Sequence, residues 1–342
     1  MTSSKSKFLE MDAKSIAVIV LAFYRKHFLL RAINSVLEQS ISESTIDIVV
    51  VKNFHDTLID NFIRDHHIKN VYTDDKSLGK KILLGIENTD SEIICFLEDD
   101  DFFTRDKIFY VKKRFGENDN VVFYHNSMIP VNANGDIMSK WYRQETELTY
   151  ANAAGTVADL RRVIHFGSHN LSSISIRRHL LNEYKMLLMD MTFNLDYTIM
   201  LIALDSDELV VSDSRKLTYY TVHNSASSPT GKDYESMRSG RGKIALSCWM
   251  NMEKIKSQIK HPLLINFVDL MALRFNIFRK VYRESGPQPD IIKYLRLYRF
   301  SFNRIDYLLS IVLFLASFAP YASASRFIYT LRMKSLRSFV DR

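Results

Sequence analysis

The residues best suited to chemistry in this chain are four consecutive carboxylates, Glu98, Asp99, Asp100 and Asp101. They directly follow Glu92–Leu97 (EIICFL), an apolar run that predicts a buried strand. Four like charges at a strand end repel one another, and a divalent cation would offset that repulsion. Carboxylate oxygens suit Mg²⁺ or Mn²⁺, which proteins often hold through one or two carboxylates while phosphate oxygens complete the shell. The cluster therefore predicts a cation site that handles phosphate; the alternative is an exposed acidic turn.

The elements that would position these carboxylates alternate between strand and helix. Ile16–Ala22 (IAVIVLA) is a continuous, β-branched apolar run, typical of a strand buried on both faces of a parallel sheet. Strands are then expected at Ile46–Val51, Asn70–Thr73 and Glu92–Leu97, and helices at Phe28–Gln39, Thr57–His66 and Gly79–Asn88. This order predicts a doubly wound α/β sheet, in which ligands bind beyond the carboxyl ends of the strands. The four carboxylates lie at such an end.

The rest of the chain suggests where this domain stops. Strands are expected at Val121–His125 and Leu217–Val222, a loop at Ser225–Lys232, and a helical pattern from about Tyr234 to the end. We therefore expect three parts: an N-terminal extension at residues 1–14, a catalytic α/β domain at residues 15–235, and a basic helical region at residues 236–342. A chain of 342 residues is long enough to bury a sizeable core.

The net charge of +7 is unevenly distributed along the chain. Residues from Arg241 to Arg342 contain 18 Lys and Arg against 6 Asp and Glu, so the preceding 240 residues carry a net charge of −5. A mildly acidic body with a basic tail predicts an anionic partner for the tail. Nucleic acid and an anionic membrane surface both fit that charge. The apolar content of the tail favours the membrane, and no nucleic-acid partner is expected.

The tail is amphipathic as well as basic. Pro262–Tyr282 and Asp290–Phe302 have helical patterns, and the nineteen residues Tyr307–Ser325 contain no charge, a length that is borderline for spanning a bilayer about 30 Å thick. Ser325–Arg342 predicts a basic amphipathic helix. Helices lying in the membrane interface would explain both properties. The alternatives are a buried core helix followed by a solvated one, and a single membrane span.

Two further features concern the compartment. The stretch before Ser15 is polar and charged, without an apolar core of signal-peptide length. Two cysteines, Cys95 and Cys248, cannot form a disulfide framework, which fits a reducing compartment. We therefore expect a cytoplasmic protein, peripheral on the cytoplasmic face of a membrane.

Four segments, taken in order, resemble the family 2 glycosyltransferases with the GT-A fold. IAVIVLAFYRKHFLLRAINSVLEQS is similar to the family's opening strand and helix, with Tyr24 and Arg25 at its YNR positions, and IDIVVVKN is similar to its second strand. SEIICFLEDDDFF is similar to the strand that ends in the metal-binding DxD motif, and FNLDYTIMLIAL to the later helix that supplies a general base. The resemblance covers residues 14 to 225. It implies a GT-A nucleotide-diphospho-sugar transferase fold, a doubly wound mixed sheet followed by a C-terminal helical region.

The resemblance also implies roles for single residues. Glu98 and Asp100 stand at the two acids of the DxD motif and Asp101 at the acid that commonly follows, so these three would bind Mg²⁺ or Mn²⁺. Asp196 stands at the catalytic base, and Asp190 is the competing candidate. The residues expected to contact the donor are Tyr24, Arg25, Lys52, Asn53, Lys80, Asp99 and His223, the last near the diphosphate.

The sequence departs from the family at two places. Lys52-Asn53 replaces the Asp that usually ends the second strand near the donor base, which leaves uracil recognition open. The family's Ala-Arg-Asn helix motif is replaced by GKKILLGI, where Lys80 or Lys81 would substitute for a phosphate-binding Arg.

The expected reaction is therefore an inverting, metal-dependent transfer of a sugar from a nucleotide-diphosphate donor to a hydroxyl of a glycan or lipid-linked acceptor. One alternative is a sugar-phosphate nucleotidyltransferase, although such enzymes usually carry a Gly-rich basic loop after the first strand, where this chain has AFYRKHF. The other is a non-catalytic binding protein that kept the fold, because fold alone does not guarantee activity.

Overall fold

The computed structural model describes residues 15–41, 46–138, 148–151, 155–206, 208–223, 233–301 and 304–318. The chain divides into two compact units, Met1–Val222 and His223–Arg342, and each is considered by itself. The first unit ends earlier than the boundary expected at residue 235.

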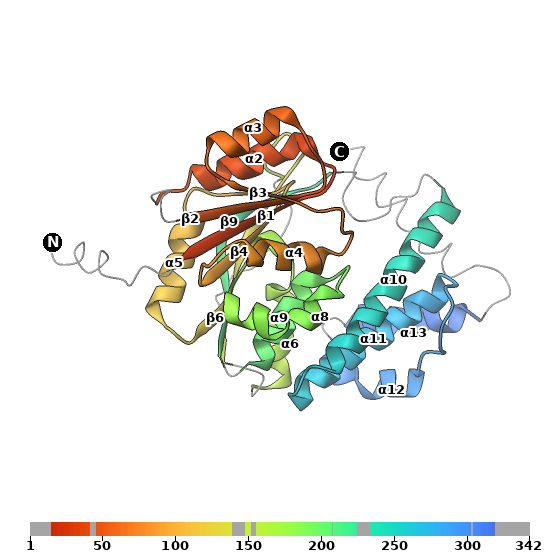
Figure 1. Ribbon diagram of the computed structural model, residues 1–342. Helices are drawn as coiled ribbons and strands as arrows, with labels where there is room; N and C mark the ends of the chain where they lie inside the picture. The colour runs from red at the N-terminus through yellow and green to blue at the C-terminus, as the bar shows by residue number, and fades with distance from the viewer. Residues whose placement is uncertain are drawn as a thin grey trace. The chain divides into compact units, whose positions relative to one another are not determined.

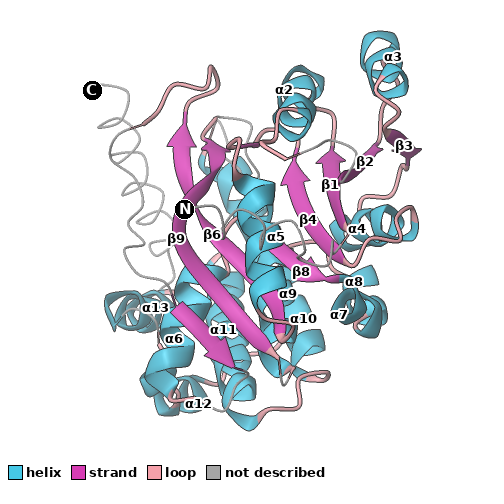
Figure 2. Cartoon of the chain, turned by 90° about the vertical axis from the view of Figure 1, so that its left-hand side faces the viewer, coloured by secondary structure: helices cyan, strands magenta, loops and turns pink. Residues whose placement is uncertain are grey.

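The centre of the first unit is β1 (Ile16–Ala22), whose seven residues are all buried. It pairs in parallel with β2 (Ile46–Lys52) and with β4 (Ile93–Glu98), and β3 (Lys69–Tyr72) adds in parallel to β2. A strand between two parallel neighbours has both faces covered, which explains why its sequence is apolar without alternation. In Figure 2 the arrowheads of β1 and β4 point toward the same edge of the sheet.

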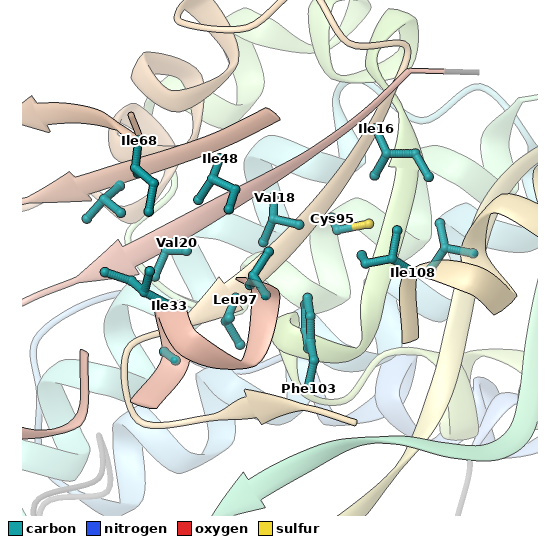
Figure 3. Close-up of a cluster of buried hydrophobic side chains, with 14 of the residues drawn as sticks. Ile16, Val18, Val20, Ile33, Ile48, Ile68, Cys95, Leu97, Phe103 and Ile108 are labelled. Atoms are coloured by element: carbon teal, nitrogen blue, oxygen red, sulfur yellow. The ribbon is translucent and has the colours of Figure 1, made fainter. Parts of the chain in front are cut away.

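Helices cover both faces of this half of the sheet, as the α/β pattern predicted. Figure 1 shows α2 (Lys26–Leu37) and α3 (Thr57–Asp65) on one face and α4 (Leu78–Glu87) on the other. Each expected strand and helix up to β4 is confirmed to within two residues. Side chains from alternate strand positions, including Val18, Val20 and Leu97, pack against Ile33 of α2 in the core drawn in Figure 3. Cys95 lies buried in the same cluster, where it packs as a small apolar side chain.

The other half of the sheet makes it mixed. β8 (Ile174–Arg177) is antiparallel to β4 and to β6 (Val121–Val131), and β6 is parallel to β9 (Leu209–Thr221). Two short strands, β5 (Phe102–Phe103) and β7 (Leu148–Ala151), are antiparallel to β9. The order of neighbouring strands across the sheet is β3-β2-β1-β4-β8-β6-β9-β5, and β7 pairs with β9 outside this order. The remaining elements of the unit are α5 (Lys107–Glu117), α6 (Val157–Gly167), η3 (Leu171–Ser173), α7 (Arg178–Glu183), α8 (Lys185–Met189) and α9 (Leu195–Asp205).

The second unit is helical. Its described elements are α10 (Tyr234–Lys256), α11 (Pro262–Val281), α12 (Ile291–Arg296), η4 (Tyr298–Phe300) and α13 (Arg304–Ala316). The helix expected over Asp290–Phe302 is broken at Leu297, whose N–H bonds to the carbonyls of both Lys293 and Tyr294, a tightening that ends α12. Within the described residues, no helix has the length and apolarity needed to cross a membrane. The basic helix expected at Ser325–Arg342 lies outside those residues.

Candidate active site

The parallel register of β1 and β4 brings the predicted acids to the loop that follows β1. Leu21 pairs with Glu98, so the chain leaves both strands at the same edge of the sheet. The N–H of Asp99 donates to the carbonyl of Leu21 at 3.1 Å, and the N–H of Phe23 donates to the Asp99 carboxylate at 2.9 Å. Asp99 is fully buried, and its contacts join the two strand ends to each other.

Arg25 provides the positive charge next to the acids. Its guanidinium lies 2.5 Å from the Asp99 carboxylate and also pairs with Asp100. The turn that carries it is held by Asn53 at the end of β2, whose side-chain oxygen accepts the Tyr24 N–H at 3.1 Å. Tyr24 has a φ of 63°, in the left-handed region that few residues other than glycine adopt, and its side chain is 69% exposed. This turn therefore buries Arg25 against the acids and presents Tyr24 to solvent.

Burial makes these carboxylates poor acids. It raises the pKa of Asp99 to about 6, although Arg25 and the Phe23 N–H oppose the shift. Burial and then the charge of Asp100 raise the pKa of Asp101 to about 7, against the Thr221 N–H that donates to it at 2.9 Å. Burial, Asp100 and Asp101 also raise the pKa of Glu98 well above its ordinary value. A ligand that brings positive charge would relieve this repulsion.

Asp196 lies close enough to this cluster for its charge to act on Glu98. It occupies the first turn of α9, just after Asn194, whose backbone is left-handed at φ 54°. Its carboxylate accepts the Tyr197 N–H at 2.9 Å. Burial raises the pKa of Asp196 to about 6, while the N–H groups of Tyr197 and Asn170 oppose the shift. Asp196 and Glu98 both remain partly accessible to solvent.

Tyr220 on β9 is a site residue that the sequence did not single out. Burial raises the pKa of its phenol to about 12, and the charges of Asp101, Glu98, Asp100 and Asp196 add to the shift. Its hydroxyl therefore stays protonated near neutral pH, among the acids that were predicted to act together. The strand LTYYTV indicated where β9 runs, but only the pairing of β9 with β6 and β5 decided which of its tyrosines faces the acids.

A turn at Asn170–Ser173 connects the acids at the end of β4 to Asp196. The Ser172 hydroxyl accepts the Glu98 N–H at 3.0 Å, and the Asn170 side chain accepts the Ser172 N–H at 2.9 Å. Asn170 itself has a φ of 64°, and its N–H supports the Asp196 carboxylate. His125, fully buried on β6, has its Nε2 at 2.7 Å from the carbonyl of His169.

The predicted donor-binding lysines are in two different environments. The ammonium of Lys52 is buried at 2.7 Å from Asp60 and donates to the Phe54 carbonyl at 2.7 Å, so it faces into the domain. The ammonium of Lys80 pairs with Asp75 at 2.9 Å. Lys81 is the lysine of α4 whose charge interacts with Asp99; burial lowers its pKa to about 8, and its ammonium lies 3.4 Å from the Phe23 ring centre.

His223 begins the second unit. Its approach to the diphosphate therefore stays a prediction, as do the assigned roles of the other site residues.

The acids can be tested for their fit to a metal ion. Among the described residues, no three His, Cys, Asp or Glu side chains form a group that could hold a metal by themselves. Asp101 nevertheless has a buried carboxylate oxygen, Oδ2, without a hydrogen-bond partner in the described part of the chain. Mg²⁺ is commonly bound by one or two carboxylates plus substrate phosphates. Asp100 and Asp101 fit a shared site of that kind.

Comparison with known proteins agrees with the fold. Residues 17–171 match the model of glycosyl transferase family 2. An uncharacterised glycosyltransferase of Rickettsia conorii is 28% identical over 139 residues, which is 40% of this chain and 22% of that protein. The match therefore spans about a fifth of the length of that relative.

Solved structures of S. aureus TarS 1–349 superpose over most of the chain. The complex with UDP-GlcNAc has a TM-score of 0.57 at 12% identity and covers 92% of both chains. The complex with UDP has a TM-score of 0.53 at 12% identity, covering 92% of this chain and 91% of TarS 1–349. At these identities the likeness concerns the fold. Residues 17–171 are therefore similar to family 2 glycosyltransferases, and the chain has the GT-A fold, with a helical region after it.

Proposed function

We propose that this chain transfers a sugar from a nucleotide-diphosphate donor to an acceptor hydroxyl, with inversion at the anomeric carbon. The observation that carries the proposal is that Asp196 and Tyr220 lie within electrostatic reach of the acids at the end of β4, where the Thr221 N–H of β9 donates to Asp101 at 2.9 Å. These residues come from three separate segments, and packing alone would not require so many acids in one buried place. The complex of TarS with UDP-GlcNAc supports a nucleotide sugar as the donor class.

The proposed roles follow from charge. Asp196 takes the proton from the acceptor hydroxyl as its oxygen attacks the anomeric carbon, and the bond from that carbon to the diphosphate breaks with its electron pair leaving on the diphosphate. General-base help of this kind contributes about 10²–10⁴-fold. Arg25 and Lys81 are two cations at this edge of the sheet that would bind and orient the phosphates.

The proposal includes Mg²⁺ or Mn²⁺, held by Asp100 and Asp101 with Glu98 beside them. When bound, such an ion stabilises the negative charge that develops on a leaving diphosphate. Arg25 pairs with Asp99 and Asp100 in this structure, so the ion would bind next to that pair.

The acceptor is proposed to be a glycan or a lipid-linked glycan. A lipid-linked acceptor would place the enzyme at a membrane surface, so peripheral contact with an anionic membrane belongs to the proposal. The charge and apolar content of the second unit support it.

Product analysis tests the proposal against its two alternatives. The full chain would be incubated with a panel of nucleotide sugars, with and without Mn²⁺ or Mg²⁺, and the released nucleotide identified. A glycosyltransferase releases a nucleoside diphosphate, and NMR of the product shows whether the anomeric centre is inverted. Sugar-phosphate nucleotidyltransferase activity, run with nucleoside triphosphates and sugar phosphates, would release pyrophosphate. Donor binding without any turnover would indicate the non-catalytic relative.

A further inference from the structure

Exposed apolar side chains are concentrated in one part of the second unit. Nine of the sixteen large hydrophobic residues that the described structure exposes lie between Ile291 and Phe318. They are Ile292, Leu295, Tyr298, Ile305, Leu308, Leu309, Val312, Leu315 and Phe318, with exposed fractions from 39% to 75%. An apolar patch of this kind on a protein surface commonly marks an interaction site.

Packing inside the unit does not account for this patch. The inner side of α13 is already used, because Tyr307, Ser310, Leu313 and Phe314 are buried. The Tyr307 ring stacks on Tyr294 of α12 with centroids 4.6 Å apart, and its hydroxyl donates to the Tyr294 carbonyl at 2.8 Å. These contacts join α12 and α13, so their exposed residues form one surface, which we call the α12–α13 face.

The charge on the α12–α13 face is positive. Arg296, Arg299 and Arg304 are exposed among its apolar residues. The Arg304 guanidinium lies 5.8 Å from the Tyr298 ring centre and the Arg299 guanidinium 4.9 Å from that of Phe300, so both stems lie along apolar surface. The sequence from Ile291 to Phe318 contains one acidic residue, Asp306. Asp269 of α11 forms an ion pair with Lys293 at 2.8 Å, so the charge of this lysine is compensated and the three arginines provide the positive charge of the α12–α13 face.

We propose that the α12–α13 face binds the surface of an anionic lipid bilayer. Apolar side chains flanked by arginines suit the boundary between acyl chains and anionic headgroups. A protein partner would explain the exposed apolar side chains alone, whereas an anionic bilayer explains both the apolar side chains and the arginines beside them. α13 has thirteen residues, and a span needs about 20, so the helix fits the plane of the interface. The inference specifies the membrane contact proposed above and does not depend on sugar transfer.

Vesicle flotation tests this directly. The full chain is mixed with phosphatidylcholine vesicles that contain or lack phosphatidylserine, at low and high salt. We expect binding only to the anionic vesicles and weaker binding at high salt, because screening reduces the attraction. Combined Leu308→Gln and Val312→Gln substitutions should weaken binding at least about tenfold, since both side chains would otherwise enter the apolar layer. The pair Arg296→Gln and Arg299→Gln should reduce the salt dependence.

Matched controls separate this surface from general hydrophobicity. Met186→Gln on α8 and Leu58→Gln on α3 remove side chains that are 75% and 79% exposed in the first unit, and they should leave vesicle binding unchanged. Thermal unfolding of every variant checks the fold. Absence of binding to anionic vesicles overturns the proposal, and so does binding that the Leu308 and Val312 pair leaves unaltered. Light scattering without lipid measures the oligomeric state. A dimer that the combined Leu308→Gln and Val312→Gln substitutions dissociate would overturn the proposal, because a second copy of the chain would then cover the α12–α13 face.

Discussion

Asp196 differs from the neighbouring candidate base, Asp190, in its surroundings. Asp190 is exposed. Asp196 is recessed at the first turn of α9, and burial raises its pKa to about 6 while two backbone N–H groups hold the carboxylate in place. A base with a pKa near the working pH is ionised often enough to act and still accepts a proton readily. The environment thus favours Asp196 for the role that its sequence position implied.

Replacing Asp196 with Asn should lower turnover by about 10²–10⁴-fold, because the amide cannot accept the acceptor proton. Donor affinity should change little. In the unmodified chain the rate should rise as the pH increases through about 6, where Asp196 loses its proton, and this rise should be absent from the variant. Asp190→Asn is the control and should keep both the rate and the pH profile. Equal losses in the two variants would contradict the assignment.

The two lysines at the start of α4 should behave differently. Lys81 is buried beside Phe23, and its charge interacts with Asp75 and then with Asp99, whereas the Lys80 ammonium forms an ion pair with Asp75 near the surface. Lys81→Met should weaken donor binding roughly 10- to 100-fold, which is the usual contribution of a hydrogen bond to a charged group. Lys80→Met should change it less than about threefold. Calorimetric titration with a nucleoside diphosphate measures both; a larger effect at Lys80 would reverse the assignment.

At the scale of elements, the turn at Asn170–Ser173 sets the geometry between the end of β4 and the start of α9. It contacts the Glu98 N–H through Ser172, and it supports Asp196 through Asn170. The Ser172 carbonyl also accepts the Thr218 hydroxyl of β9 at 3.2 Å. The acids, the base and β9 are therefore linked by a few residues between α6 and β8, and the site depends on the antiparallel insertion of β8 into the sheet.

Two adjacent serines allow a matched test of this turn. Ser172→Ala removes the acceptor of the Glu98 N–H and should destabilise the chain by about 1–3 kcal/mol, as expected for a buried donor left without a partner. Ser173 is equally buried, but its hydroxyl has no hydrogen-bond partner among the described residues. Ser173→Ala should therefore change stability by less than about 0.5 kcal/mol. Urea unfolding of both variants measures the difference, and similar losses would show that the Ser172 bond has no special role.

At the scale of the whole molecule, the buried titratable groups act on stability in opposite directions. The pKa values of Asp99, Asp101 and Asp196 rise from 3.8 to about 6, 7 and 6 on folding, mainly through burial. Their stabilising contribution is complete below pH about 4 and is lost as the pH rises through 6 to 7. Burial lowers the pKa of His125 from 6.5 to about 3, so its contribution is present above pH 6.5 and declines below it.

A divalent cation should therefore stabilise the chain most at alkaline pH. At ten times its dissociation constant, Mn²⁺ contributes about 1.4 kcal/mol, which should raise the melting temperature by about 3–6 °C at pH 8. The rise should be much smaller at pH 5, where protons occupy the acids. Asp101→Asn should raise the metal-free melting temperature at pH 8 and reduce the Mn²⁺ effect. Scanning fluorimetry checks this, and an equal shift at both pH values would exclude the acids as the cation site.

Local patterns in the sequence determined the first half of the sheet and the place of the acids. Ile16–Ala22 and Glu92–Leu97 predict strands because a strand buried on both faces must be apolar throughout, and acids directly after such a strand must lie at the sheet edge. The YNR and DxD resemblance depended on the same local order. The sequence between Arg161 and Ser212 has a mixed pattern that predicts no clear order of helices and strands. Short elements such as α7, α8 and β8 are fixed by their neighbours more than by their own periodicity.

Only the tertiary structure decided which distant groups meet at the acids. Tyr220, Lys81 and the turn at Asn170–Ser173 reach the site through strand pairing and helix packing between residues far apart in the chain, and no local pattern records such contacts. The tertiary structure also decided the place of the Lys52 side chain. Its buried ammonium forms an ion pair with Asp60, because a buried charge requires a partner. The exposed side of α13 is a similar case: its sequence is apolar all round, and packing against α11 and α12 decided which residues remained outside.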